Sequence, residues 1–143
     1  MTIETAFDGL LILSQDNWPR DRWPNFSHRE MKCKHTGQCR LDGAFMDRLQ
    51  EIRTMLGFGL VVTSGYRHPT HPDEASKEKG PGYHTKGLAV DIGIYGSRCH
   101  QLVEVASGIV PIYGIGLNQK GPLTGRFVHL DGRDREQRTV FTY

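Results

Sequence analysis

Two histidines and one aspartate could bind a common metal ion. His84 closes a glycine-rich loop, and Asp91 follows it in the middle of an apolar segment. An ionised carboxylate among apolar residues is unfavourable unless it is paired or bound to a metal. Gly87 lies between the two residues and allows a sharp turn that brings their side chains together.

His129 is the third residue of this set. It lies in the sequence Arg-Phe-Val-His-Leu-Asp, where strand alternation puts Phe127, His129 and Asp131 on one face. Two histidines and a carboxylate make a three-ligand zinc site, and a fourth position left to water is typical of catalytic zinc. The spacing alone leaves an alternative open, in which both histidines are hydrogen-bonded core residues and Asp91 caps a turn.

The segments around these residues predict a sheet and two main helices. Apolar side chains recur with a 3.6-residue period over residues 42–56, and Gly57 stands where that helix should end. Residues 60–64 and 88–94 predict buried strands, and the long loop between them is of a length that usually has a function. Further predicted elements are a capping-box turn from Ser27 to Glu30, a helix at 97–107, and strands at 113–117, 127–130 and 139–143. We therefore expect an α+β fold with a mostly antiparallel central sheet.

Length and composition exclude several classes of protein. The chain has 143 residues, enough for one domain at roughly 150 residues per domain. Its 18 basic and 16 acidic residues give a net charge of +2 and form no basic stripe, so we expect no nucleic-acid partner. No apolar run approaches the ~20 residues of a membrane helix, and no cationic segment precedes Leu10–Leu13. We expect no membrane insertion and no signal peptide, and therefore synthesis in the cytoplasm.

The N-terminal residues 1–25 predict a lead-in strap before a domain at 26–143. Trp18 and Trp23 each precede a proline, which favours an extended chain. The two indole rings are expected to pack on the body of the protein, and the alternative is an aromatic platform for a substrate.

Three cysteines are an odd number, which argues against a disulfide framework. The sequence from Cys33 to Cys39 is similar to a small metal knuckle, but it offers at most three ligands in a row. A second zinc, a disulfide and free thiols all remain open for these residues.

Four motifs, taken in order, resemble the zinc D-Ala-D-Ala carboxypeptidase family. That family also holds phage L-alanyl-D-glutamate endolysins, vancomycin-resistance dipeptidases and relatives of the hedgehog signalling domain. The resemblance extends from Phe26 to Tyr143. The motifs are Thr63-Ser64-Gly65-Tyr66-Arg67, Gly82-Tyr83-His84-Thr85-Lys86-Gly87-Leu88-Ala89-Val90-Asp91-Ile92, Gly114-Ile115-Gly116 and Phe127-Val128-His129-Leu130-Asp131.

The resemblance implies a hedgehog-like, DD-peptidase-like fold with helices packed on one side of the sheet. It implies that His84, Asp91 and His129 are the ligands of a Zn²⁺ ion, and that Arg67 faces the substrate. A guanidinium near the metal can hold a substrate carboxylate or a developing oxyanion. The alternative for Arg67 is a salt bridge within the loop.

The sequence departs from the family pattern at three positions. Gly82 stands where many members have serine, Arg126 where some have a glutamate that acts as general base, and Phe127 where others have histidine. The identity of the base is therefore open. Asp131 shares a strand face with His129, and we expect it either to act as the base or to orient that histidine.

These observations together predict a zinc metallopeptidase that cleaves peptidoglycan stem or cross-bridge peptides. Either a D-Ala-D-Ala carboxypeptidase or an L-Ala-D-Glu endolysin is expected, working as a monomer on the cell wall in phage lysis or as a virion component. Residues 70–83 would shape one wall of the cleft. The alternatives are a non-catalytic zinc-bearing binding module and a structural virion or cell-wall module.

Overall fold

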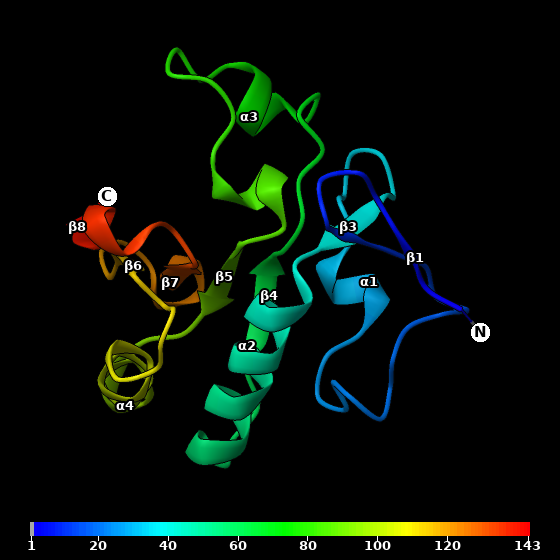
Figure 1. Cartoon of the computed structure of the whole chain (residues 1–143). Coiled ribbons are helices and arrows are strands. Elements are labelled where there is room, and N and C mark those ends of the chain that lie inside the picture. Colours follow the sequence, from blue (N-terminus) through cyan, green and yellow to red (C-terminus); the bar gives the residue numbers. More distant parts are fainter. Residues whose placement is uncertain (1) are drawn as a thin grey trace.

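A five-stranded sheet forms the centre of the protein. In the computed structural model, which describes residues 2–143, its strands lie in the order β4-β5-β7-β6-β8 (Figure 1). Neighbouring strands are antiparallel except β6 and β8, which are parallel. The strands are β4 (Val61–Ser64), β5 (Ala89–Gly93), β6 (Gly114–Asn118), β7 (Phe127–Asp131) and β8 (Thr139–Thr142).

A second, three-stranded sheet lies towards the N-terminus. It consists of β1 (Glu4–Thr5), β2 (Leu11–Leu13) and β3 (Cys39–Leu41), all antiparallel. The α+β class and the mostly antiparallel central sheet are confirmed, while the additional small sheet and the parallel β6–β8 pair go beyond what the sequence predicts. Strands of two or three residues are too short to show an alternating pattern, and pairing direction is not encoded in that pattern.

The two longer helices cover the face of the central sheet opposite the candidate metal ligands. Val90 and Ile92 on β5 are fully buried and belong to the same hydrophobic cluster as Leu49 and Leu102 from these helices. The two helices also contact each other. The helices are α1 (His28–Met31), α2 (Gly43–Leu56), α3 (Pro72–Ala75) and α4 (Gly96–Ser107). The expected one-sided packing therefore holds for α2 and α4, whereas α1 lies against β4 and α3 lies in the long loop.

The ends of α1 and α2 follow the predicted capping signals. The Asp42 side chain accepts a hydrogen bond of 2.8 Å from the Phe45 N–H, and the helix stops at Gly57, which has a left-handed φ of 74°. The Ser27 hydroxyl likewise accepts from the Glu30 N–H at 3.2 Å. These bonds satisfy backbone donors that the first turn of a helix leaves free.

The N-terminal strap is packed into the body of the protein. Trp18 is 5% exposed and Trp23 is 0% exposed, and their ring centroids lie 5.4 Å apart. The indole N–H of Trp23 donates to Asp47 on α2 at 2.9 Å. Trp18 donates to the Phe26 carbonyl at the same distance. Both rings are thus used in packing, as expected for the strap.

The loop after β4 contains α3 and a 3-10 turn, η1 (Tyr83–Lys86), before it enters β5. Gly87 ends this turn with a φ of +64°. A Cβ atom at Gly87 would lie 2.7 Å from the carbonyl oxygen of Arg40. The Gly87 carbonyl accepts from the Asp42 N–H at 3.0 Å, so the turn is attached to the start of α2. Glycine is therefore required where the chain turns between His84 and Asp91.

The three cysteines are buried and free. Burial raises the pKa of the Cys39 thiol to about 12, so this thiol is protonated at neutral pH. Within residues 2–143, no helix is long and apolar enough to cross a membrane.

Candidate metal centre

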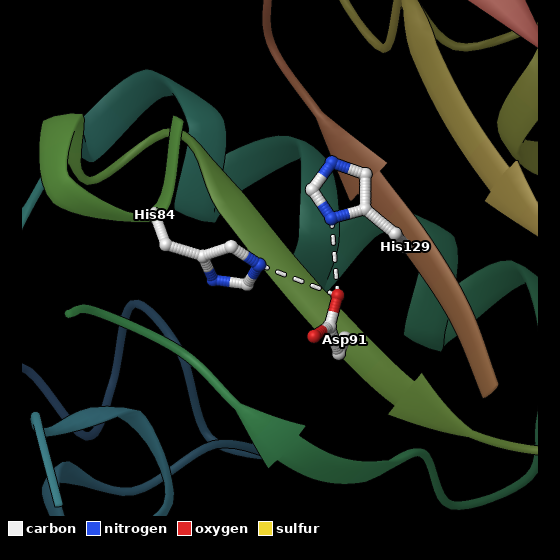
Figure 2. Close-up of side chains that lie close together, drawn as sticks. All are labelled: His84, Asp91 and His129. Atoms are coloured by element: carbon white, nitrogen blue, oxygen red, sulfur yellow. Dashed lines mark hydrogen bonds and ion pairs between the residues drawn. The ribbon is translucent and has the colours of Figure 1, made fainter. Parts of the chain in front are cut away.

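The side chains of His84, Asp91 and His129 converge on one point at the surface of the central sheet. Nε2 of His84 lies 3.3 Å from Oδ1 of Asp91, and Nδ1 of His129 lies 3.0 Å from the same oxygen. One nitrogen or oxygen atom from each residue lies within 4.8 Å of the other two. Figure 2 shows the two imidazole rings directed at the carboxylate from different elements. The structure thus brings together the three residues that the sequence selects as zinc ligands.

Strand register brings Asp91 and His129 together. The two residues are direct partners on the adjacent strands β5 and β7. Their side chains leave the face opposite Val90 and Ile92, as alternation requires. On β6, a Cβ atom at Gly116 would lie 3.2 Å from the Cβ of His129 and closer still to the ring of Phe141. Glycine on β6 therefore leaves room for the histidine.

The remaining ring nitrogen of each histidine faces an oxygen acceptor. Nδ1 of His84 lies 2.7 Å from the Gly65 carbonyl, and Nε2 of His129 lies 2.6 Å from Oδ2 of Asp131. With the ring hydrogens on these outer nitrogens, Nε2 of His84 and Nδ1 of His129 would be free to bind a metal ion, which neutral imidazole does through its unprotonated nitrogen.

The charges of the centre are mutually stabilised. Burial would raise the pKa of Asp91, but hydrogen bonds and charge interactions with His129 and His84 outweigh it and lower the pKa. Burial would lower the pKa of His129, but its contacts with Asp131 and Asp91 raise it. Asp91 is therefore an ionised carboxylate at neutral pH, which is the form that binds a cation.

Asp131 lies on the side of the His129 ring away from Asp91 and is completely buried. Its two carboxylate oxygens accept from the side chain of Arg133 at 2.9 and 2.7 Å. Oδ1 also accepts from the Arg133 backbone N–H at 3.0 Å. Of the two roles that the sequence leaves open for Asp131, this geometry supports the orienting one, because both oxygens are occupied and neither reaches the cavity.

Arg67 extends from the end of β4 to the rim of the centre. Its Nε donates to the Ser64 hydroxyl at 3.0 Å, and Nη1 donates to Glu74 at 2.9 Å. Nη2 lies 3.4 Å from Oδ2 of Asp91. The loop salt bridge that the sequence offers as the alternative for Arg67 is therefore present, and the side chain also lies beside the candidate ligands.

A cavity of about 520 Å³ opens over the three candidate ligands. The loop segment expected to shape one wall contributes five of the lining residues, and β7 and β8 contribute Phe127 and Phe141. Burial raises the pKa of Tyr143 at this cavity to about 12, so its phenol is neutral. The residues lining the cavity are Arg67, Asp73, Ser76, Lys77, Gly82, Tyr83, His84, Asp91, Phe127, His129, Arg133, Phe141 and Tyr143.

Sequence reasoning missed two charged residues of this region. Glu74 is one of several acidic residues in a polar loop, and only its place in the first turn after Pro72 distinguishes it. Arg133 follows Asp131 by two residues, beyond the end of the strand. Both pair with residues of the quoted motifs, Glu74 with Arg67 and Gly82 and Arg133 with Asp131, but they lie outside those motifs and no periodic pattern marks them.

The donor set fits zinc. Two imidazole nitrogens and one carboxylate are a common three-ligand set, and each histidine has the outer hydrogen-bond acceptor that usually accompanies a zinc ligand. Among the described residues, no fourth histidine, cysteine, aspartate or glutamate joins this group. Cys33 and Cys39 likewise form no second group of this kind within residues 2–143, which gives no support for a second zinc.

A three-ligand centre below an open cavity, carried on an α+β fold, is the arrangement of a metal-dependent hydrolase. Comparison with protein families matches residues 24–131 to the family described as peptidase M15. The chain belongs to this family. A search of curated proteins found no match.

Proposed function

We propose that the protein is a zinc-dependent peptidase acting on the stem or cross-bridge peptides of peptidoglycan, with His84, Asp91 and His129 as the zinc ligands. Membership of the peptidase M15 family implies a hydrolase of peptides. The observation that carries the proposal is the convergence of three metal-binding side chains under an open cavity. The peptidoglycan substrate is supported by the resemblance of the four motifs to D-Ala-D-Ala carboxypeptidases and L-Ala-D-Glu endolysins.

Zinc, when bound, would polarise the scissile carbonyl group and lower the pKa of a water molecule from about 15.7 to about 7. The chain's own residues orient the groups around that chemistry. Asp131 holds Nε2–H of His129 and so directs Nδ1 to the metal position, while the Gly65 carbonyl does the same for His84. Both are positioning contacts, because neither Asp131 nor Gly65 lines the cavity.

Arg67 is the residue that we assign to the substrate itself. It lines the cavity and has N–H groups beyond those used by its three partners. These donors can hold a carboxylate of the substrate or stabilise negative charge that develops on the carbonyl oxygen during attack. Apart from Asp91, Asp73 is the one carboxylate among the lining residues, and Asp73→Asn tests whether it accepts the proton from water.

The same resemblance supports two candidate bonds and a setting for the reaction. We propose a carboxypeptidase that removes the terminal D-alanine or an endopeptidase that cuts between L-alanine and D-glutamate. The protein would work on the cell wall, in phage lysis or as part of a virion.

Digestion of purified peptidoglycan followed by mass spectrometry of the muropeptides tests this proposal. We expect fragments shortened by one D-alanine or separated at L-Ala-D-Glu, loss of these products on chelation, and their return when zinc is added. Undigested muropeptides with a zinc-loaded, folded protein would contradict the peptidase proposal.

Undigested muropeptides with a folded, zinc-loaded protein would favour a zinc-bearing module without turnover. Arg126 and Phe127 occupy the positions where relatives carry a catalytic glutamate or histidine, and this departure is the observation that favours such a module. One equivalent of bound zinc without any cleavage identifies it.

A further inference from the structure

Glu74 is a fully buried carboxylate in the loop beside the candidate metal centre. Its side chain is 0% exposed although it lies in a short helix of a polar segment. Oε2 accepts from Nη1 of Arg67 and from Nζ of Lys77, each at 2.9 Å. Oε1 accepts from the Gly82 backbone N–H at 2.7 Å. A single carboxylate therefore joins the start, the middle and the end of the loop.

These bonds keep Glu74 ionised. Burial would raise its pKa, but the bonds from Lys77, Gly82 and Arg67 outweigh burial and lower the pKa to about 2. The space is closely filled, because a Cβ atom at Gly82 would lie 3.0 Å from Nζ of Lys77. The negative charge of Glu74 thus holds two cationic side chains to the same oxygen.

Both cations line the cavity above the candidate ligands, whereas Glu74 does not. Glu74 neutralises one of the two positive charges, and the carboxylates of Asp73 and Asp91 also line this cavity. A guanidinium has five N–H donors and an ammonium has three, and the described contacts use three of the former and one of the latter. The unused donors of Arg67 and Lys77 are available to an anionic group in the cavity.

We infer that Glu74 is a positioning residue that holds Arg67 and Lys77 together on one cavity wall, where the two cations receive a carboxylate of the substrate peptide. Charge-assisted hydrogen bonds from two fixed cations recognise a carboxylate much better than a neutral amide of the same shape. Lys77 is then a determinant of specificity. This inference rests on the proposed peptidase function, because it concerns the peptide bound at that same site.

The test compares acid and amide forms of one peptide. The probes are acetyl-L-Ala-D-Glu-L-Lys-D-Ala-D-Ala, its C-terminal amide, and the form in which the D-glutamate carboxylate is an amide. Zinc-loaded wild-type protein, Glu74→Gln and Lys77→Met are each measured by calorimetry and, where cleavage occurs, by KM and kcat. Glu78→Gln and Lys79→Met, which change exposed residues of the same loop, are the matched controls.

We expect one of the two amidations to weaken binding to the wild type by roughly 10- to 100-fold, the range of a charge-assisted hydrogen bond. In Glu74→Gln and Lys77→Met the same amidation should lower the affinity by less than about threefold. In the two controls it should lower the affinity as much as in the wild type. If Glu74 had a purely structural role, Glu74→Gln would bind the acid and amide forms of the peptide more weakly by the same factor. Thermal unfolding shows whether Glu74→Gln is folded. If Glu74→Gln does not fold, Lys77→Met still tests the inference.

Two results overturn the inference. In one, the wild type binds acid and amide forms equally or binds none of them. In the other, both variants discriminate as strongly as the wild type. Absence of cleavage alone contradicts the peptidase proposal and not this inference, because the calorimetric comparison needs no turnover.

Discussion

The two halves of the candidate metal centre are held in place by different means. Asp91 and His129 come from adjacent strands, and sheet register alone puts them opposite each other. His84 and Arg67 come from the loop after β4, where the Gly65 carbonyl, Glu74 and the left-handed turn at Gly87 determine their positions. The strand half therefore depends on backbone pairing that many residues share, and the loop half depends on a few specific side chains.

The largest effect is expected in the strand half, from His129→Ala. Removal of this imidazole leaves two ligands, which should remove most of the bound zinc and all hydrolysis. Zinc content by elemental analysis and cleavage of peptidoglycan measure both. His100→Ala, at an exposed histidine on α4, is the control and should change neither. Full activity of His129→Ala would show that the ligand assignment is wrong.

Asp131→Asn distinguishes positioning from proton transfer within the same half. Loss of the charged acceptor at Nε2 of His129 should weaken zinc affinity by roughly 10- to 100-fold, as is typical for such outer contacts. Competition with a chromogenic chelator measures that affinity. Unchanged zinc affinity with lost turnover would instead assign Asp131 as the base, and unchanged turnover would remove it from the site.

In the loop half, Gly87→Ala should lower the free energy of unfolding by about 2–3 kcal/mol. The φ of +64° is unfavourable for alanine, and the added methyl group would lie 2.7 Å from the Arg40 carbonyl oxygen. Urea denaturation gives the value. Gly125→Ala, where a Cβ atom would meet nothing within 4 Å, is the control. Equal stability of the two variants would mean that the turn does not constrain the loop.

The smallest effect is expected in the pH dependence of stability of Glu74→Gln. The pKa of Glu74 is about 2 in the folded protein against an ordinary value of 4.5, so the unfolded chain binds its proton first as the pH falls. The stabilisation from this group is complete above about pH 4.5 and is lost as the pH falls through 2.

Glu74→Gln lacks this carboxylate. As the pH falls from about 4.5 to 2, its free energy of unfolding should therefore decrease less steeply than that of the wild type. The two slopes should differ by up to about 1.4 kcal/mol per pH unit. Glu78→Gln is the control, and urea denaturation at each pH gives the slopes. Identical slopes in the wild type and Glu74→Gln would contradict the account of the loop half.

The two halves also differ in how far the sequence predicts them. The helix α2, the strands β5 and β7, and the common face of Asp91 and His129 follow from periodicity, caps and alternation, which are local properties. The small N-terminal sheet depends on pairing between distant segments. Glu74, Arg67 and Gly82 lie within one loop, but no periodic pattern predicts how such a loop folds, so only the folded chain shows that they meet.

Crystals of the zinc-loaded protein, measured at the zinc absorption edge, test the central claim most directly. The account predicts one anomalous peak within about 2.0–2.2 Å of Nε2 of His84, the Asp91 carboxylate and Nδ1 of His129, with solvent in the remaining position. A zinc ion bound elsewhere, or one whose remaining position is closed by a fourth protein donor, would contradict it.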